Sequence, residues 1–171
     1  MKAVRSLFSR PRYAMGLVAV LVAIDQTVKW AVEKYLPLQE MVEVLPVLAL
    51  FHTQNPGIAF SMLSFVGEKW LIALMLLVIA FVSVLWAKSS PARWLSQMGF
   101  AFIIAGAIGN LIDRSVHGYV IDYILVHTQT WYFAVFNLAD SFITVGAAAI
   151  IIDELFGKWI YRSDPPETEK S

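Results

Sequence analysis

The stretch 70–86, WLIALMLLVIAFVSVLW, contains no charged residue and has a tryptophan at each end. A helix needs about 20 apolar residues to cross the hydrocarbon core of a bilayer, and tryptophan is enriched at both membrane interfaces. Outward from this stretch, three more segments are long and apolar enough, so the predicted spans cover about residues 13–32, 70–87, 94–112 and 133–152. The whole chain is 58% hydrophobic, with a mean hydropathy of +0.66. We therefore expect an all-α membrane protein with four transmembrane helices and a single integral membrane domain over residues 1–171.

The basic residues predict how these spans are oriented, because Lys and Arg near the ends of spans are retained on the cytoplasmic side. Nine of the thirteen basic residues fall on one side: Lys2, Arg5, Arg10, Arg12, Lys88, Arg93, Lys158, Arg162 and Lys170. This distribution predicts that both termini are cytoplasmic, with a cytoplasmic tail at 157–171. The segments 33–69 and 113–132 are then extracytoplasmic.

Both extracytoplasmic segments contain short strand patterns. Apolar β-branched and aromatic residues alternate in part over 42–53, and Asn55, Pro56 and Gly57 follow as a turn signal. A second run at 119–126 alternates around Asp122. We expect these runs to form a small extracytoplasmic β-cradle that rests on the bilayer surface.

Composition excludes several classes of function. Thirteen basic and thirteen acidic residues give a formal net charge of zero, so the total charge does not indicate binding to nucleic acid. The chain has no cysteine, which excludes disulfides, cysteine nucleophiles and zinc-thiolate sites. Its three histidines lack the spacing of metal ligands, and no glycine-rich phosphate loop is present, so we expect neither a metal nor a cofactor.

Ionisable residues collect near the outer ends of the predicted spans, where each is costly unless it is paired or hydrated. Asp25 and Lys29 stand four residues apart and share one face of the first helix. Asn110, Asp113 and Arg114 come at the outer end of the third span. A self-neutralising pair of Asp25 with Lys29, and a structural cap of Asp113 with Arg114, are open alternatives to a functional site.

Two more carboxylates, Asp122 and Asp140, are predicted at the same outer level. Singly, Asp122 could be a solvated loop residue, and Asp140 could be a helix-terminal charge favoured by the macrodipole. Together, two convergent carboxylates could share one proton and hydrolyse an amide by general acid and base catalysis. A proton-coupled transporter or channel, and a non-catalytic membrane chaperone or assembly subunit, are the rival functions.

Five motifs in order resemble those of the lipoprotein signal peptidases (signal peptidase II) of bacteria, over nearly the whole chain. They are Asp-Gln-x-x-Lys at 25–29, Asn-x-Gly-x-Ala-Phe at 55–60, Gly-Asn-x-x-Asp-Arg at 109–114, two hydrophobic residues followed by Asp and an aromatic at 120–123, and Phe-Asn-x-Ala-Asp at 136–140. One departure is Ala107, where the family often has glycine, which affects helix packing and not the chemistry.

The resemblance implies an aspartic endopeptidase that removes the signal peptide from prolipoproteins, just before a cysteine that carries a diacylglyceryl group. It implies Asp122 and Asp140 as the catalytic dyad. The residues that would line the substrate site are Asn55, Gly57, Asn110, Arg114 and Asn137, and those that would support its architecture are Asp25, Lys29 and Asp113. The segment 56–65 would form an interfacial flap over the site.

The same resemblance implies the partners and the location. The partners would be a lipid-modified prolipoprotein, membrane lipids and a globomycin-type inhibitor, with no nucleic acid, and the protein would be a monomer. It would lie in the bacterial cytoplasmic (inner) membrane, with the active site near the outer leaflet.

Overall fold

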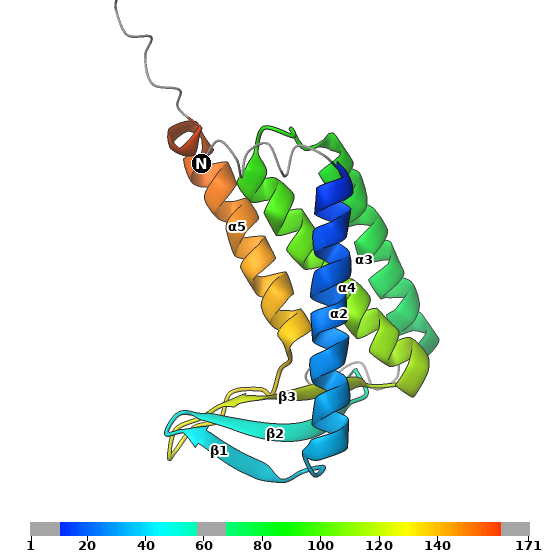
Figure 1. Cartoon of the computed structure of the whole chain (residues 1–171), viewed down its shortest axis with the longest axis vertical. Helices are drawn as coiled ribbons and strands as arrows, with labels where there is room; N and C mark the ends of the chain where they lie inside the picture. The colour runs from blue at the N-terminus through cyan, green and yellow to red at the C-terminus, as the bar shows by residue number, and fades with distance from the viewer. Residues whose placement is uncertain (1–10, 58–67, 162–171) are drawn as a thin grey trace, which may run out of the picture.

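The computed structural model describes residues 11–57 and 68–161. Its elements, in order, are α2 (Pro11–Tyr35), β1 (Met41–Leu45), β2 (Leu48–Asn55), α3 (Glu68–Lys88), α4 (Trp94–His117), β3 (Val120–Val126) and α5 (Leu138–Ile160). In this part of the chain, the long helices lie side by side and a small sheet lies across one end of them (Figure 1). Residues 58–65 of the predicted flap at 56–65 lie outside the described residues.

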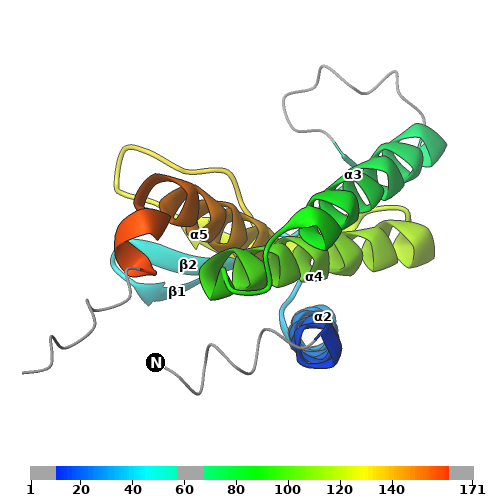
Figure 2. The same ribbon diagram turned by 90° about the horizontal axis from the view of Figure 1, so that it is seen from above.

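Helix α4 is the centre of the helical layer, because it contacts α2, α3 and α5, which surround it in Figure 2. Its approach to α5 is very close. A Cβ atom added at Gly99 would overlap the carbonyl oxygen of Gly146, and one added at Gly106 would overlap the carbonyl oxygen of Ala139. Small residues allow this spacing between helices in membranes, so the two backbones are held nearly in contact.

Within the described residues, three helical segments are long and apolar enough to cross a membrane, namely Tyr13–Tyr35, Lys69–Lys88 and Trp94–His117. Helix α5 is of similar length, with 23 residues. It carries four charged side chains, which are Asp140, Asp153, Glu154 and Lys158. The fold is therefore mostly helical, with three candidate membrane helices and one further long helix.

Several predicted boundaries differ from the structure. The first span was predicted to end at 32 and the fourth at 152, with a tail from 157, but α2 continues to Tyr35 and α5 to Ile160. The third span was predicted to end at 112, but α4 continues to His117 and ends where Gly118 adopts a left-handed conformation with φ 80°. The fourth span was predicted from 133, but α5 begins only at Leu138. The backbone before it is extended and pairs with β3: Phe133 N donates to Val126 O at 2.9 Å, and Ile124 and Phe136 exchange two hydrogen bonds.

The sheet has the order β1-β2-β3 and is antiparallel, which confirms the strand patterns at 42–53 and 119–126. β1 is an edge strand, and all five of its residues are exposed. β3 lies nearest the helices. Ile121 and Tyr123 on its inner face pack with Val32 of α2 in a buried cluster. Because side chains alternate along a strand, this packing turns Asp122 to the opposite face, toward the end of β2.

Candidate active site

Asp122 sits in the middle of β3 with only 2% of its surface exposed. One carboxylate oxygen, Oδ2, accepts a hydrogen bond of 2.9 Å from the side-chain amide of Asn55, at the end of β2. The other, Oδ1, accepts one of 2.7 Å from the side-chain amide of Asn137. Both oxygens of this buried carboxylate are thus bound by neutral donors.

Asp140 lies in the first turn of α5, where the local sequence forms a capping box. The side-chain oxygen of the N-cap residue Asn137 accepts a hydrogen bond of 3.0 Å from Asp140 N, and Asp140 Oδ2 accepts one of 3.3 Å from Asn137 N. This reciprocal pair satisfies two backbone donors that a helix start leaves free. Asp140 is therefore a helix-terminal residue, as one interpretation of the sequence predicted. Its other carboxylate oxygen, Oδ1, has a different partner.

That partner is Asn110, on α4. Its side-chain amide donates to Asp140 Oδ1 at 2.7 Å, while its own Oδ1 accepts a hydrogen bond of 3.2 Å from Asn137. Asn137 therefore contacts Asp122, Asp140 and Asn110 at once. The two carboxylates, which come from a strand and a helix, are therefore joined by one hydrogen-bond network that runs through Asn137 and Asn110.

The electrostatics of Asp122 follow from this setting. Burial raises its pKa to about 6, the hydrogen bonds from Asn55 and Asn137 oppose the rise, and the nearby negative charge of Asp140 adds to it. Neither amide carries a charge that could neutralise the carboxylate. Asp122 can therefore exchange a proton close to neutral pH.

Beside this network lies a buried ionic cluster on α2 and α4. Lys29 Nζ forms ion pairs with Asp25 Oδ2 at 3.0 Å and Asp113 Oδ2 at 2.7 Å, and it donates to Asn110 Oδ1 at 3.1 Å. The three charged side chains are at most 2% exposed. Asp113 and Arg114 point in different directions because they are adjacent on the helix, and Asp113 pairs with Lys29. Because the lysine also holds Asn110, the cluster fixes the amide that contacts Asp140.

The approach of α2 to α4 at this cluster depends on a glycine. A Cβ atom added at Gly109 would overlap Asp25 Oδ2. Gln26 adds two hydrogen bonds between α2 and α4, since its amide donates to Gly109 O at 3.2 Å and to Asp113 Oδ1 at 2.9 Å. Gln26 was not among the predicted site residues, although its place inside the Asp-Gln-x-x-Lys motif was a usable signal.

Gly57 and Arg114 border the network. Gly57 has φ 101°, which favours glycine, and its N–H donates to Asn55 Oδ1 at 2.9 Å, so the side-chain amide of Asn55 is free to face Asp122. Arg114 is half-buried, and its Nη1 has no hydrogen-bond partner among the described residues. Its guanidinium interacts electrostatically with Asp122, Asp140 and Asp113. It supplies positive charge near the two carboxylates.

All ten predicted site residues therefore lie in two adjoining groups or at their border. Asn55, Asn110, Asp122, Asn137 and Asp140 share the amide and carboxylate network, Asp25, Lys29 and Asp113 form the ionic cluster, and Gly57 and Arg114 lie at the border. Tyr123 was missed: its hydroxyl accepts a hydrogen bond of 3.3 Å from Leu138 N at the start of α5. No local pattern links these two residues.

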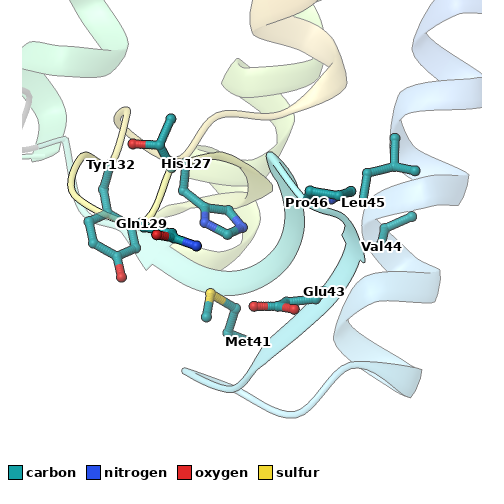
Figure 3. A pocket seen from close by; sticks show the side chains of 9 residues that line it. Met41, Glu43, Val44, Leu45, Pro46, His127, Gln129 and Tyr132 are labelled. Atoms are coloured by element: carbon teal, nitrogen blue, oxygen red, sulfur yellow. The ribbon is translucent and has the colours of Figure 1, made fainter.

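A separate hollow lies at the far end of the sheet, with a volume of about 550 Å³. Figure 3 shows Met41 and Glu43 of β1 on one side of it and His127, Gln129 and Tyr132 on another. None of its lining residues belongs to the network described above. Across residues 11–57 and 68–161, no group of three or more His, Asp and Glu side chains is placed to hold a metal ion.

Comparison with known proteins gives a consistent assignment. The family model for Signal peptidase (SPase) II matches residues 17–156. A lipoprotein signal peptidase of Sinorhizobium fredii is 55% identical over 150 residues, which is 88% of this chain and 90% of the relative. One of Brucella ovis is 54% identical over 144 residues, covering 84% of this chain and 90% of the relative.

Solved structures agree with the sequence relatives. A bacterial membrane enzyme superimposes with a TM-score of 0.76 at 25% identity, over 90% of this chain and 94% of the other. A second bacterial membrane enzyme gives a TM-score of 0.75 at 28% identity, over 83% and 92% of the two chains. The chain therefore has the fold of these bacterial membrane enzymes, and it belongs to the signal peptidase II family of lipoprotein-processing proteases.

Proposed function

We propose that this protein is an aspartic endopeptidase that removes the signal peptide from prolipoproteins whose cysteine carries a diacylglyceryl group. The observation that carries the proposal is the link between the two carboxylates through Asn137, whose side-chain amide donates to Asp122 and to Asn110, while Asn110 donates to Asp140. Two carboxylates held together in this way can act as an acid and a base on one substrate bond. The relatives named lipoprotein signal peptidase supply the substrate class.

In this proposal the dyad carries one shared proton. The ionised carboxylate takes a proton from water as the water oxygen attacks the scissile carbonyl carbon, and the protonated carboxyl group donates to the carbonyl oxygen. As the tetrahedral intermediate collapses, the C–N bond breaks, the leaving nitrogen takes the proton that came from water, and the hydroxyl returns its proton to the dyad. Because burial raises the pKa of Asp122 to about 6, we assign the shared proton to Asp122.

The surrounding residues have supporting roles. Asn110 and Asn137 orient the two carboxylates, and Asn55 and Gly57 hold the strand end that faces Asp122. Lys29, with Asp25 and Asp113, fixes Asn110 from the α2 side. Arg114 offsets part of the negative charge of the pair, which limits the electrostatic cost of two acids in one site.

The location follows from the charge distribution. Lys88 and Arg93 lie at the junction of α3 and α4, at the other end of the helical layer from the sheet (Figure 1). Since basic residues are retained in the cytoplasm, we place four spans in the inner membrane, both termini inside, and the sheet and dyad near the outer leaflet. A lipidated cysteine would hold its scissile bond at this same level.

A cleavage assay with two forms of one substrate tests the proposal. The detergent-purified protein is incubated with a prolipoprotein that carries the diacylglyceryl group, and with the same polypeptide lacking it. We expect the mass of the modified form to fall by that of the leader, with a new N-terminus at the lipidated cysteine and inhibition by globomycin. No cleavage of the modified form, or a cut at another bond, would refute the proposed function.

A further inference from the structure

Another buried carboxylate lies at the opposite end of the α4–α5 pair from the dyad. Asp153 of α5 is completely buried. Its Oδ2 accepts hydrogen bonds from Arg93 Nε, at 2.7 Å, and from the hydroxyl of Ser96, and its Oδ1 accepts one from the hydroxyl of Tyr161. We call Arg93, Ser96, Asp153 and Tyr161 the clasp. The chemistry proposed above does not use any of them.

The clasp joins the first turn of α4 to the last turns of α5. Tyr161 connects both sides, since its hydroxyl also accepts a hydrogen bond of 3.3 Å from Leu95 N, a backbone donor that a helix start leaves without an intrahelical partner. Burial raises the pKa of Tyr161 to about 12, so the phenol stays protonated and continues to donate to Asp153 at neutral pH.

Between the clasp and the dyad, the backbones of α4 and α5 approach each other very closely. Gly99 and Gly146 interlock, because a Cβ atom on either one would overlap the carbonyl oxygen of the other. Nearer the dyad, a Cβ atom on Gly106 would overlap the carbonyl oxygen of Ala139. Backbones in such close contact transmit an axial position from one end to the other, since interiors packed this closely do not deform continuously.

The spacing along the two antiparallel helices agrees with this connection. Fourteen residues separate Ser96 from Asn110 on α4, and thirteen separate Asp153 from Asp140 on α5, which is about 20 Å on each helix. A slip of α5 by one residue would move Asp140 by about 1.5 Å and rotate it by about 100°. Either change would break its 2.7 Å hydrogen bond with Asn110.

We propose that Asp153 is a positioning residue for the dyad, because its clasp fixes the register of α5 on α4 and thereby places Asp140 against Asn110. This inference rests on the proposed function of the dyad. It predicts an effect on the rate of the chemical step and not on substrate binding, since Asp153 lies about 20 Å along the helix from the dyad.

The main test is Asp153→Ala, with Glu154→Gln as the matched control. Glu154 is the next residue, and its carboxylate is also bonded to Arg93, at 2.7 Å, but its side chain is 63% exposed. We expect Asp153→Ala to lower kcat by about 10²-fold, the scale of a 1 Å misplacement, with KM unchanged. Glu154→Gln should keep the wild-type kcat. Cleavage of a lipid-modified prolipoprotein by the purified variants measures both constants.

A distance measurement separates positioning from a loss of stability. The chain has no cysteine, so spin labels can be attached at Val116→Cys on α4 and Val145→Cys on α5, whose native side chains are 69% and 54% exposed. We expect Asp153→Ala to shift or broaden the distribution of distances between the labels. The same labels in the Glu154→Gln background should reproduce the wild-type distribution.

If Asp153→Ala does not fold, Tyr161→Phe gives the same test in milder form, because it removes one donor and leaves Arg93 and Ser96 on Asp153. We then expect a smaller fall in kcat together with a broader distribution of label distances. An unchanged kcat, or unchanged distances, in the variant that folds would overturn the inference. Failure of the wild-type chain to cut a prolipoprotein would instead refute the proposed function, and the distances would still report the register.

Discussion

The two ends of the α4–α5 pair each hold a buried carboxylate, and their partners differ in charge. Asp122 is bound by two neutral amides, so its negative charge is not compensated by them and burial raises its pKa to about 6. Asp153 is bound by a guanidinium and two hydroxyl groups. The difference teaches that burial alone does not make a carboxylate reactive. Arg93 offsets the charge of Asp153 and ties α4 to α5, whereas the two amides leave the charge of Asp122 uncompensated.

The ionic cluster on α2 and α4 is intermediate between these two. Asp25 and Asp113 share a single lysine, and Asp25 Oδ1 has no hydrogen-bond partner among the described residues. Its lysine also reaches Asn110 of the dyad network. The charges of this cluster therefore hold α2 against α4. Its link to the dyad network is the hydrogen bond from Lys29 to the side chain of Asn110.

The largest expected effect is the loss of activity when either carboxylate of the dyad is replaced. Asp122→Asn and Asp140→Asn should each lower kcat by at least about 10³-fold, because an amide cannot take part in the proton transfers of the dyad. Asp153→Asn, which also removes one carboxylate charge, should lose far less activity. Cleavage of a prolipoprotein by the purified variants measures all three. Full cleavage by either dyad variant would refute the role of that residue.

Next in size is the loss of the shared cation in the ionic cluster. Lys29→Met leaves Asp25 and Asp113 buried without their partner, so the free energy of unfolding should fall by about 3–5 kcal/mol. Lys34→Met is the matched control on the same helix, where the exposed lysine lies over the rings of Trp30 and Tyr35. It should change the stability by no more than about 0.5 kcal/mol. Denaturant unfolding in detergent compares them, and equal losses would contradict the structural role of Lys29.

A smaller effect is expected at the groups that orient the dyad. Asn110→Ala removes the 2.7 Å hydrogen bond to Asp140, and Arg114→Ala removes positive charge from beside both carboxylates. Each should lower kcat by about tenfold or more. Deletion of the tail after Ser163 is the reference and should leave activity close to wild type. Similar losses in all three proteins, in a quantitative cleavage assay, would contradict this ranking.

The smallest expected effect is a shift in pH dependence. The pKa of Asp122 is raised from 3.8 to about 6 in the folded protein, so the proton it carries in the proposed mechanism is lost as the pH rises past about 6, and kcat/KM should then fall. The hydrogen bond from Asn55 lowers this pKa. Asn55→Ala should therefore move the alkaline limb of the profile to higher pH. A limb that stays in place, or moves to lower pH, would show that Asp122 does not carry that proton.

The raised pKa of Asp122 also makes the stability of the folded protein depend on pH. Because the folded pKa of Asp122 lies above the unfolded value of 3.8, the folded state binds the proton more tightly than the unfolded state. Its contribution to stability is fully present below about pH 4 and is lost as the pH rises through about 6. Asp122→Asn should remove this pH dependence of unfolding, and a persistent dependence in that variant would assign it to another group.

Local patterns in the sequence predicted most of the fold. Hydrophobic length located the long helices, and alternation with a turn signal located the strands. The start of α5 was wrong because the apolar run at 133–136 suits a helix or a strand equally well. Pairing with β3 keeps that run extended, and the capping box of Asn137 and Asp140 starts the helix. The end of α4 was misplaced because Asp113 is polar in sequence but buried within the cluster.

The site was accessible from the sequence through its motifs, and the clasp was not. Each motif holds its polar residues within a few positions of one another. Arg93 and Asp153 are sixty residues apart, and Arg93 looked like an ordinary cytoplasmic base that sets orientation. Only the packing of α4 against α5 brings them together, so no local spacing could have predicted their contact.

The most direct test of the central claim is a double-mutant cycle on the dyad under single-turnover conditions. The cleavage rate of a lipid-modified prolipoprotein is measured for the wild type, Asp122→Asn, Asp140→Asn and the double variant. Residues that act as one unit give non-additive losses, so we predict that the double variant is no slower than the slower single variant. Losses that multiply would contradict a shared-proton pair.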